Sequence, residues 1–182
     1  GGGGSSPQFL TAANGTLYFV ADDGATGAEP WKYDPTKGTA VRLGDLREGS
    51  ESAICSGSPW YTFFDPQFTN VAGTLFFRAD DGHNGVELWK ADDQGTGMVT
   101  DLRPGVESYL QSQYGITAPA SSYPSGLTEY NDNLFFGARN IQEGFELWTV
   151  QWERPPIAAD DLGYEVAQDR SLTVDHLVPV GG

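Results

Sequence analysis

One segment of the amino-acid sequence occurs three times, and this repeat limits the folds that are open to the chain. The copies read GTLYFVADDG, GTLFFRADDG and NLFFGARNIQ, and each is followed by a glutamate and a tryptophan two residues apart. The leucine of each copy lies 58 or 59 residues from the next one. The same spacings separate the tryptophans, which are Trp31, Trp89 and Trp148. Equal spacings at two positions identify a tandem repeat, which predicts one structural unit per copy.

Apolar residues alternate within each copy with the period of a β-strand. Two of them share one side of each predicted strand, which we expect to face the core: Leu17 and Phe19, Leu75 and Phe77, and Leu134 and Phe136. A turn rich in Gly and Asp leads to a second strand, which carries the tryptophan. Further strands are expected at 39–47 and 96–105, and before each copy at 9–13, 68–71 and 127–130. Glycine is frequent and a 3.6-residue period is absent, so we expect essentially no helix.

A small sheet with one apolar face is not stable alone, because that face needs a second layer to cover it. We therefore predict an all-β fold in which three repeats of short antiparallel strands pack side by side, like the blades of a β-propeller. With three units the arrangement can stay open. The tryptophans suit the space between adjacent sheets, where we expect them to pack; a role as sugar-stacking platforms is the alternative.

The chain divides into a linker, a repeat domain and a tail. Residues 1–7 are mostly Gly and Ser and indicate a flexible linker. The repeat domain covers 8–154, with repeats at about 8–65, 66–125 and 126–154. Residues 155–182 form an extended linker and strand segment, which starts with two prolines.

The third copy departs from the other two after Trp148, where the expected turn and third strand are missing. This predicts an unpaired sheet edge, which proteins normally cover or use. The tail, by contrast, has a strand pattern with no partner: Tyr164, Val166, Leu172 and Val174 alternate with polar residues. Two interpretations stay open. The tail is donated to another subunit by strand addition, giving a head-to-tail assembly, or it is the start of a further module and here folds back or is disordered.

The first two copies, at 14–32 and 73–90, and the DLREG and DLRPG turns that follow them resemble the bacterial ELWxxDGT-type tandem repeat, whose signature is NGTLFFxADDGxxGxELWK. The resemblance implies a propeller-like fold and an extracellular or cell-surface location. The tail segment PPIAADDLGYEVAQDRSLTVD resembles the start of bacterial cadherin-like or immunoglobulin-like modules. Few repeats of this family have an assigned function, so the resemblance indicates fold and location rather than activity.

Acidic residues outnumber basic ones by 25 to 10, which gives the chain a net charge of −15. Such a surface repels phosphate backbones and anionic lipid headgroups, so we expect no nucleic-acid partner and no membrane insertion. His83 and His176 are the only histidines, and neither has a catalytic neighbour in the sequence. We therefore predict a protein that is not an enzyme.

Calcium is the cofactor that the sequence suggests, since paired aspartates in tight turns offer the hard oxygen ligands that it selects. The candidate ligands are Asp22, Asp23, Asp80, Asp81, Asp160 and Asp161. The alternative is that these side chains cap their own turns. Cys55 is the only cysteine, which leaves a half-buried thiol or an intermolecular link as its interpretations.

Two classes of function remain. The first is a structural or assembly module of an extracellular or cell-surface protein, which self-associates as a homopolymer or with a neighbouring module and forms a filament by strand addition. The second is a lectin-like propeller module that binds carbohydrate or protein through aromatic residues of the loops between repeats. Those residues are Trp60, Tyr61, Phe63, Phe64, Tyr109 and Tyr114.

Overall fold

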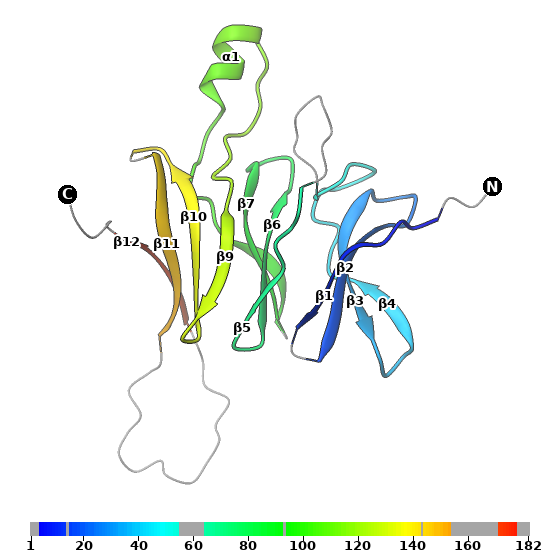
Figure 1. Cartoon of the computed structure of the whole chain (residues 1–182). Helices are drawn as coiled ribbons and strands as arrows, with labels where there is room; N and C mark the ends of the chain where they lie inside the picture. The colour runs from blue at the N-terminus through cyan, green and yellow to red at the C-terminus, as the bar shows by residue number, and fades with distance from the viewer. Residues whose placement is uncertain are drawn as a thin grey trace, which may run out of the picture.

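The computed structural model describes residues 4–13, 15–54, 64–92, 94–142, 144–153 and 171–177. In these residues, twelve strands form three four-stranded antiparallel sheets. The sheets stand side by side in an open row, and each contains one copy of the repeated segment (Figure 1). The prediction of an all-β fold is confirmed.

The first two sheets are simple meanders, in which strands that follow one another in sequence are also hydrogen-bonded neighbours. The first contains β1 (Gln8–Ala13), β2 (Thr16–Asp22), β3 (Ala28–Asp34) and β4 (Thr39–Arg42). The second contains β5 (Thr69–Val71), β6 (Thr74–Asp80), β7 (Val86–Asp92) and β8 (Gly95–Thr100). β4 and β8 are shorter than the sequence pattern predicts. Ala72 and Gly73 join β5 to β6 with φ angles of 48° and 92°, as the favoured two-residue hairpin turn requires.

The third sheet includes a strand from the tail. Its strands are β9 (Ser125–Tyr130), β10 (Asn133–Asn140), β11 (Gly144–Glu153) and β12 (Ser171–Leu177). β12 pairs with β11 at the sheet edge, from Glu153 opposite Ser171 to Leu147 opposite Leu177. The expectation that the tail strand has no partner in this chain is therefore wrong. The repeat pattern predicts this strand directly after Trp148, but antiparallel pairing tolerates a long connection, because loop-closure entropy grows slowly with length.

A short helix, α1 (Ser108–Tyr114), lies in the connection between β8 and β9, and it is the one exception among the described residues to the expectation of essentially no helix. Gly115 ends the helix with a φ angle of 65°, and its amide donates to the carbonyl of Gln111 at 3.1 Å. No side chain of α1 is buried, so the helix has no apolar stripe that a sequence pattern could reveal. Within the described residues, no helix is long and apolar enough to cross a membrane.

Two apolar clusters fill the spaces between the sheets. The first joins the first and second sheets and includes Val20, Ala28, Leu75 and Phe77. The second joins the second and third sheets and includes Phe76, Leu88, Leu134, Phe136 and Trp148. The second sheet is therefore covered on both faces, whereas each outer sheet has a packed inner face and an outer face without a neighbouring sheet.

Candidate functional site

Each sheet has two different faces, because side chains alternate along a strand. One face, here called the tryptophan face, carries the repeat tryptophan opposite a phenylalanine on the neighbouring strand. These cross-strand pairs are Phe19 with Trp31, Phe77 with Trp89, and Phe136 with Trp148. The other face is here called the reverse face; in the second sheet it carries Phe76 and Leu88, which are fully buried.

The tryptophans have one structural role in all three sheets. The indole N–H of Trp31 donates to the carbonyl of Ala21 at 3.0 Å. Trp89 and Trp148 make the same bond to Ala79 and Ala138, at 3.1 and 3.2 Å. Trp89 and Trp148 are buried between sheets, while Trp31 on the outer sheet is half-buried. Their indole groups therefore brace the two central strands of each sheet.

The same two kinds of face meet at both junctions inside the chain. At the first junction, Val20 and Ala28 on the reverse face of the first sheet pack against Phe77 on the tryptophan face of the second. At the second junction, Phe76 and Leu88 on the reverse face of the second sheet pack against the tryptophan face of the third. The packing of reverse face on tryptophan face is thus repeated.

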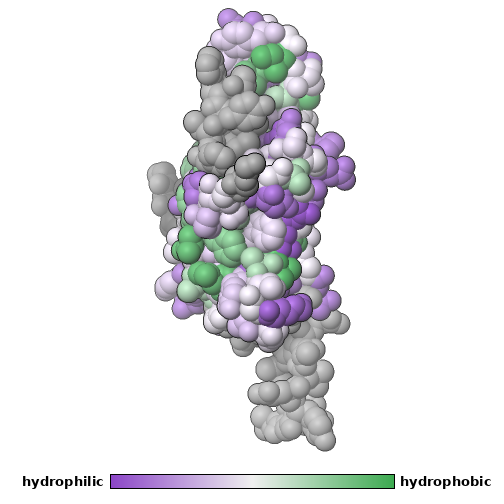
Figure 2. Space-filling model, turned by 90° about the vertical axis from the view of Figure 1, so that its right-hand side faces the viewer, coloured by the Kyte–Doolittle hydropathy of each residue, from purple (hydrophilic) through white to green (hydrophobic). Residues whose placement is uncertain are grey.

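In the described part of the chain, no sheet lies against the tryptophan face of the first sheet. Leu17 is 37% exposed and Tyr33 is 42% exposed, although the corresponding Leu75 is 1% exposed. Figure 2, which views this end of the row, shows hydrophobic patches among polar residues. The expectation that Leu17 lies in the core is therefore wrong, and Phe19 on the same face is half-buried rather than buried.

At the other end of the row, the reverse face of the third sheet is also uncovered. Phe145 is 55% exposed and Leu147 is 48% exposed, while the ring of Phe135 packs against Tyr130 with centroids 6.1 Å apart. A Cβ atom on Gly137 would lie 2.6 Å from the Phe145 ring, so glycine allows this ring to lie flat on the sheet. The outermost sheets thus expose one apolar face of each kind.

A buried glutamate holds the connection that leaves each of the first two sheets. Glu29 is fully buried and accepts hydrogen bonds from the amides of Leu46 at 3.0 Å and Ala53 at 3.1 Å. Glu87 repeats this, with the amides of Leu102 at 3.3 Å and Ser122 at 2.7 Å. Burial raises the pKa of both carboxyl groups to about 7.

The backbone of each connection then joins two sheets. The amide of Ile54 donates to the Ala28 carbonyl of the first sheet, and the Ala53 carbonyl accepts from the Asp80 amide of the second, at 3.3 and 2.9 Å. The second junction repeats both bonds, from Tyr123 to Val86 at 3.2 Å and from Arg139 to Ser122 at 2.7 Å. The relative placement of neighbouring sheets is therefore fixed twice by the same bonds.

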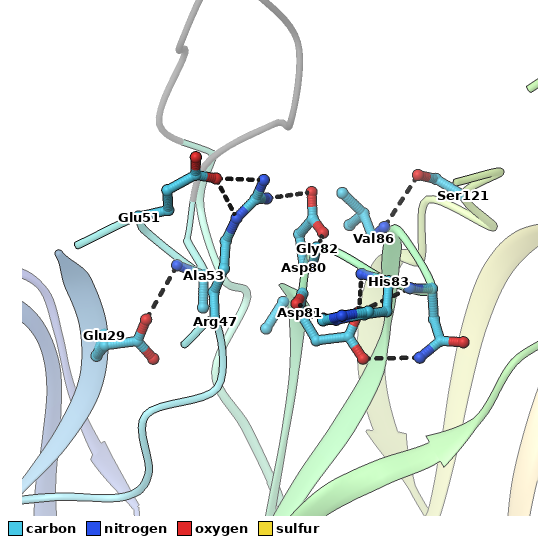
Figure 3. A network of polar contacts seen from close by, with 12 residues as sticks. Glu29, Arg47, Glu51, Ala53, Asp80, Asp81, Gly82, His83, Val86 and Ser121 are labelled. Atoms are coloured by element: carbon cyan, nitrogen blue, oxygen red, sulfur yellow. Dashed lines mark hydrogen bonds and ion pairs between the residues drawn. The ribbon is translucent and has the colours of Figure 1, made fainter. Parts of the chain in front are cut away.

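An ion pair strengthens the first of these junctions. Arg47 lies 3.0 Å from Asp80 of the second sheet and 2.6 Å from Glu51 of its own loop, as Figure 3 shows. At the second junction, Arg103 pairs with Glu107 at 2.6 Å, but the third copy has Arg139 where Asp80 would be. The sequence pattern does not reveal the junction role of these residues, because an insertion in the second connection breaks the 58-residue spacing.

The paired aspartates cap their own turns. Asp23 accepts from the amides of Ala25 and Thr26, both at 2.9 Å, and these bonds lower its pKa. Asp81 likewise accepts from the amides of His83 and Asn84 at 2.8 and 2.7 Å. Asp22 and Asp80 each accept from the glycine amide two residues later, at 2.7 Å. Among the described residues, no three His, Cys, Asp or Glu side chains are grouped to hold a metal ion.

The structure describes only some of the remaining predicted residues. Tyr109 and Tyr114 lie together on α1, with ring centroids 6.1 Å apart. Phe64 lies under the Arg78 guanidinium at 5.0 Å, and Val174 of β12 packs on the second cluster. Leu172 has its backbone in β12. The other candidates lie outside the described residues: Cys55, Trp60, Tyr61, Phe63, Asp160, Asp161, Tyr164 and Val166.

Comparison with known proteins identifies no relative: no family model matches the chain, and no curated protein or solved structure is significantly similar to it.

Proposed function

We propose that this chain is a non-enzymatic structural module that assembles head to tail through its two exposed sheet faces. The tryptophan face of the first sheet in one copy packs on the reverse face of the third sheet in the next. One observation carries this proposal: the two uncovered faces are of the same two kinds that pack on each other at both internal junctions. A second copy therefore offers each end the type of surface that it lacks.

The exposed side chains are consistent with such a contact. Leu17 and Tyr33 at one end, and Phe145 and Leu147 at the other, are large apolar or aromatic residues that stay partly in water in a single copy. Burying them releases the water that covers them, which favours association. Because the two surfaces differ, the contact is heterologous, and repeated copies form a ring if the rotation closes and a filament if it does not.

Packing of faces replaces strand addition as the proposed contact. Strand addition needs a free edge on the third sheet, and β12 of the same chain already pairs with β11 at that edge. The location that we propose, outside the cell or on its surface, rests on the resemblance to ELWxxDGT-type repeats. In such a location the net charge of −15 favours solubility.

The test uses one variant for each end. Leu17→Lys places a charge on the tryptophan face and Leu147→Glu places one on the reverse face; both residues are partly exposed, so folding is expected to survive. Sedimentation velocity from about 1 μM to 1 mM should show association of the unaltered chain and monomers for either variant. Ile141→Lys, at a residue 64% exposed in the turn between β10 and β11, is the matched control and should associate normally.

Mixing the two variants gives the sharpest outcome. The Leu17→Lys variant keeps its reverse face and the Leu147→Glu variant keeps its tryptophan face, so the mixture should form a dimer and stop there. Two monomers in the mixture, or an unaltered chain that stays monomeric throughout the range, would contradict the proposal. If the contact joined two faces of the same kind, the variant that leaves that face unaltered would still associate by itself. That result would also contradict the proposal.

A further inference from the structure

A cavity of about 620 Å³ lies beside the junction of the first two sheets, away from the two end faces. Three segments line it: Arg47 from the first connection, the turn between β6 and β7, and the chain around α1. Its volume is in the range of small-molecule sites, which take up roughly 300–1,000 Å³. The assembly proposed above does not use it.

One wall of the cavity is the insertion that distinguishes the second connection from the first. Ser52 accepts from the Ala28 amide of β3 and follows Glu51 directly. Ser121 accepts from the Val86 amide of β7 in the same way, but it comes 14 residues after Glu107. The base of the insertion is pinned by two backbone hydrogen bonds, from Glu107 to Ala118 at 2.8 Å and from Ala120 to Gly105 at 3.0 Å. The wall is therefore a fixed loop that the repeat itself does not need.

The insertion presents aromatic rings that do not serve the core. Tyr109 is 59% exposed and Tyr114 is 62% exposed, and their rings meet edge to face. Both line the cavity, together with Tyr123, Leu110 and Ile116. Tyrosine supplies a large, rigid contact surface at low conformational cost, which suits a binding surface. Since no side chain of α1 is buried, these rings contribute little to folding.

The floor of the cavity is polar and charged. Asp80 is 3% exposed, accepts from the Gly82 amide at 2.7 Å and pairs with Arg47 at 3.0 Å. Gly82 faces the Arg47 side chain, where a Cβ atom would stand 3.4 Å from Nε, and its φ angle of 80° favours glycine. A carboxylate and a guanidinium side by side provide acceptors and donors close together.

We propose that this cavity binds a neutral carbohydrate of one or two pyranose rings. The apolar face of a ring packs on Tyr109 or Tyr114, and its hydroxyl groups, each both donor and acceptor, bond to the Asp80 and Arg47 side chains on the floor. Asp80 and Glu107 line the cavity and the chain carries a net charge of −15, so uronic or sulfated sugars are repelled.

A peptide fits this cavity less well. Recognition of an extended peptide by β-strand addition relies on free backbone groups along a strand edge. Here the backbone beside the cavity is already paired, because Val106 bridges to Pro119 and Tyr123 donates to Val86. The remaining contacts are aromatic rings and a polar floor, which are provided by side chains.

The test is calorimetric titration of the full chain with the neutral tetrasaccharides cellotetraose, xylotetraose, maltotetraose and mannotetraose. We expect at least one to bind with a Kd below about 1 mM. Tyr109→Ala and Tyr114→Ala should each weaken binding about tenfold or more without lowering Tm. Tyr114→Phe, which keeps the ring, should bind almost as the unaltered chain does. Ile141→Ala, at an exposed residue of the turn between β10 and β11 that does not line the cavity, is the control and should bind normally.

Three results would overturn the proposal. The first is no heat of binding with any of the four sugars at millimolar concentration. The second is equal binding by trigalacturonic acid, or binding of a proline-rich peptide in place of the sugars. The third is binding that neither alanine variant weakens. The association of each variant is also measured by sedimentation velocity. Association that stays unchanged while sugar binding changes would show that the two proposals stand or fail independently.

Discussion

At the scale of single residues, equivalent tryptophans lie in unequal surroundings. All three make the same indole bond, but Trp89 is covered by the first sheet and Trp31 has no sheet over it. We expect Trp89→Ala to lower the free energy of unfolding by about 3–5 kcal/mol, as large-to-small core changes do. Trp31→Ala should cost clearly less in a dilute monomer and should weaken association. Denaturant titration measures the first effect; equal losses for both variants would contradict an open first sheet.

The buried glutamates predict a stability that depends on pH. Glu29 and Glu87 have a pKa of about 7 when folded against an ordinary value of 4.5, so the folded chain holds these protons more tightly than the unfolded chain. The free energy of unfolding is therefore expected to fall as the pH rises from about 5 to 7, by up to about 3 kcal/mol for each group. Denaturant titrations at several pH values measure this slope.

Glu87→Gln removes one of the two titrating groups, so its stability should change less over the same pH range. The control is Glu48→Gln, the same substitution at an exposed glutamate, which should keep the original slope. If both variants kept the slope, the repulsion among surface carboxylates would be its cause, and the buried glutamate would not be.

At the scale of elements, β12 is the strand on which the third sheet depends. It covers the edge of β11, and its Val174 packs on the second cluster. Deleting residues 154–182 should therefore lower Tm and promote aggregation, because it exposes a long strand edge. Thermal unfolding of both chains over a range of concentrations measures this. In the Leu17→Lys variant, whose head-to-tail association is blocked, pairing within one chain predicts a Tm that is independent of concentration, whereas a β12 exchanged between copies predicts a Tm that rises with concentration.

At the scale of the whole molecule, the junctions determine what the assembly would be. The same hydrogen bonds and the same kinds of face relate the first sheet to the second and the second to the third. A third contact of this geometry, made between copies, would continue the row with a similar rotation. One discrete mass in sedimentation would indicate a closed, propeller-like ring, whereas a continuous series of masses would indicate a filament.

The sequence by itself determines the central strands of each sheet, because these strands arise from patterns among neighbouring residues. Alternation of apolar residues, glycines at the turns and a tryptophan at a fixed place predict the central strands of each sheet, and the structure confirms them. Leu17 and Leu75 have almost the same neighbours in sequence, yet one is exposed and the other buried. The number of sheets that cover a residue is not a local property, so only the tertiary structure decides this difference.

The same reason applies to the rest of the site. The pairing of β12 with β11, the contacts of Glu29 and Glu87, and the cavity beneath α1 all join residues that are far apart or irregularly spaced in the chain. No period in the sequence reports them. The sequence specifies three sheets, each with two different faces; the order in which those faces are covered, and which two remain in water, depends on how the sheets pack.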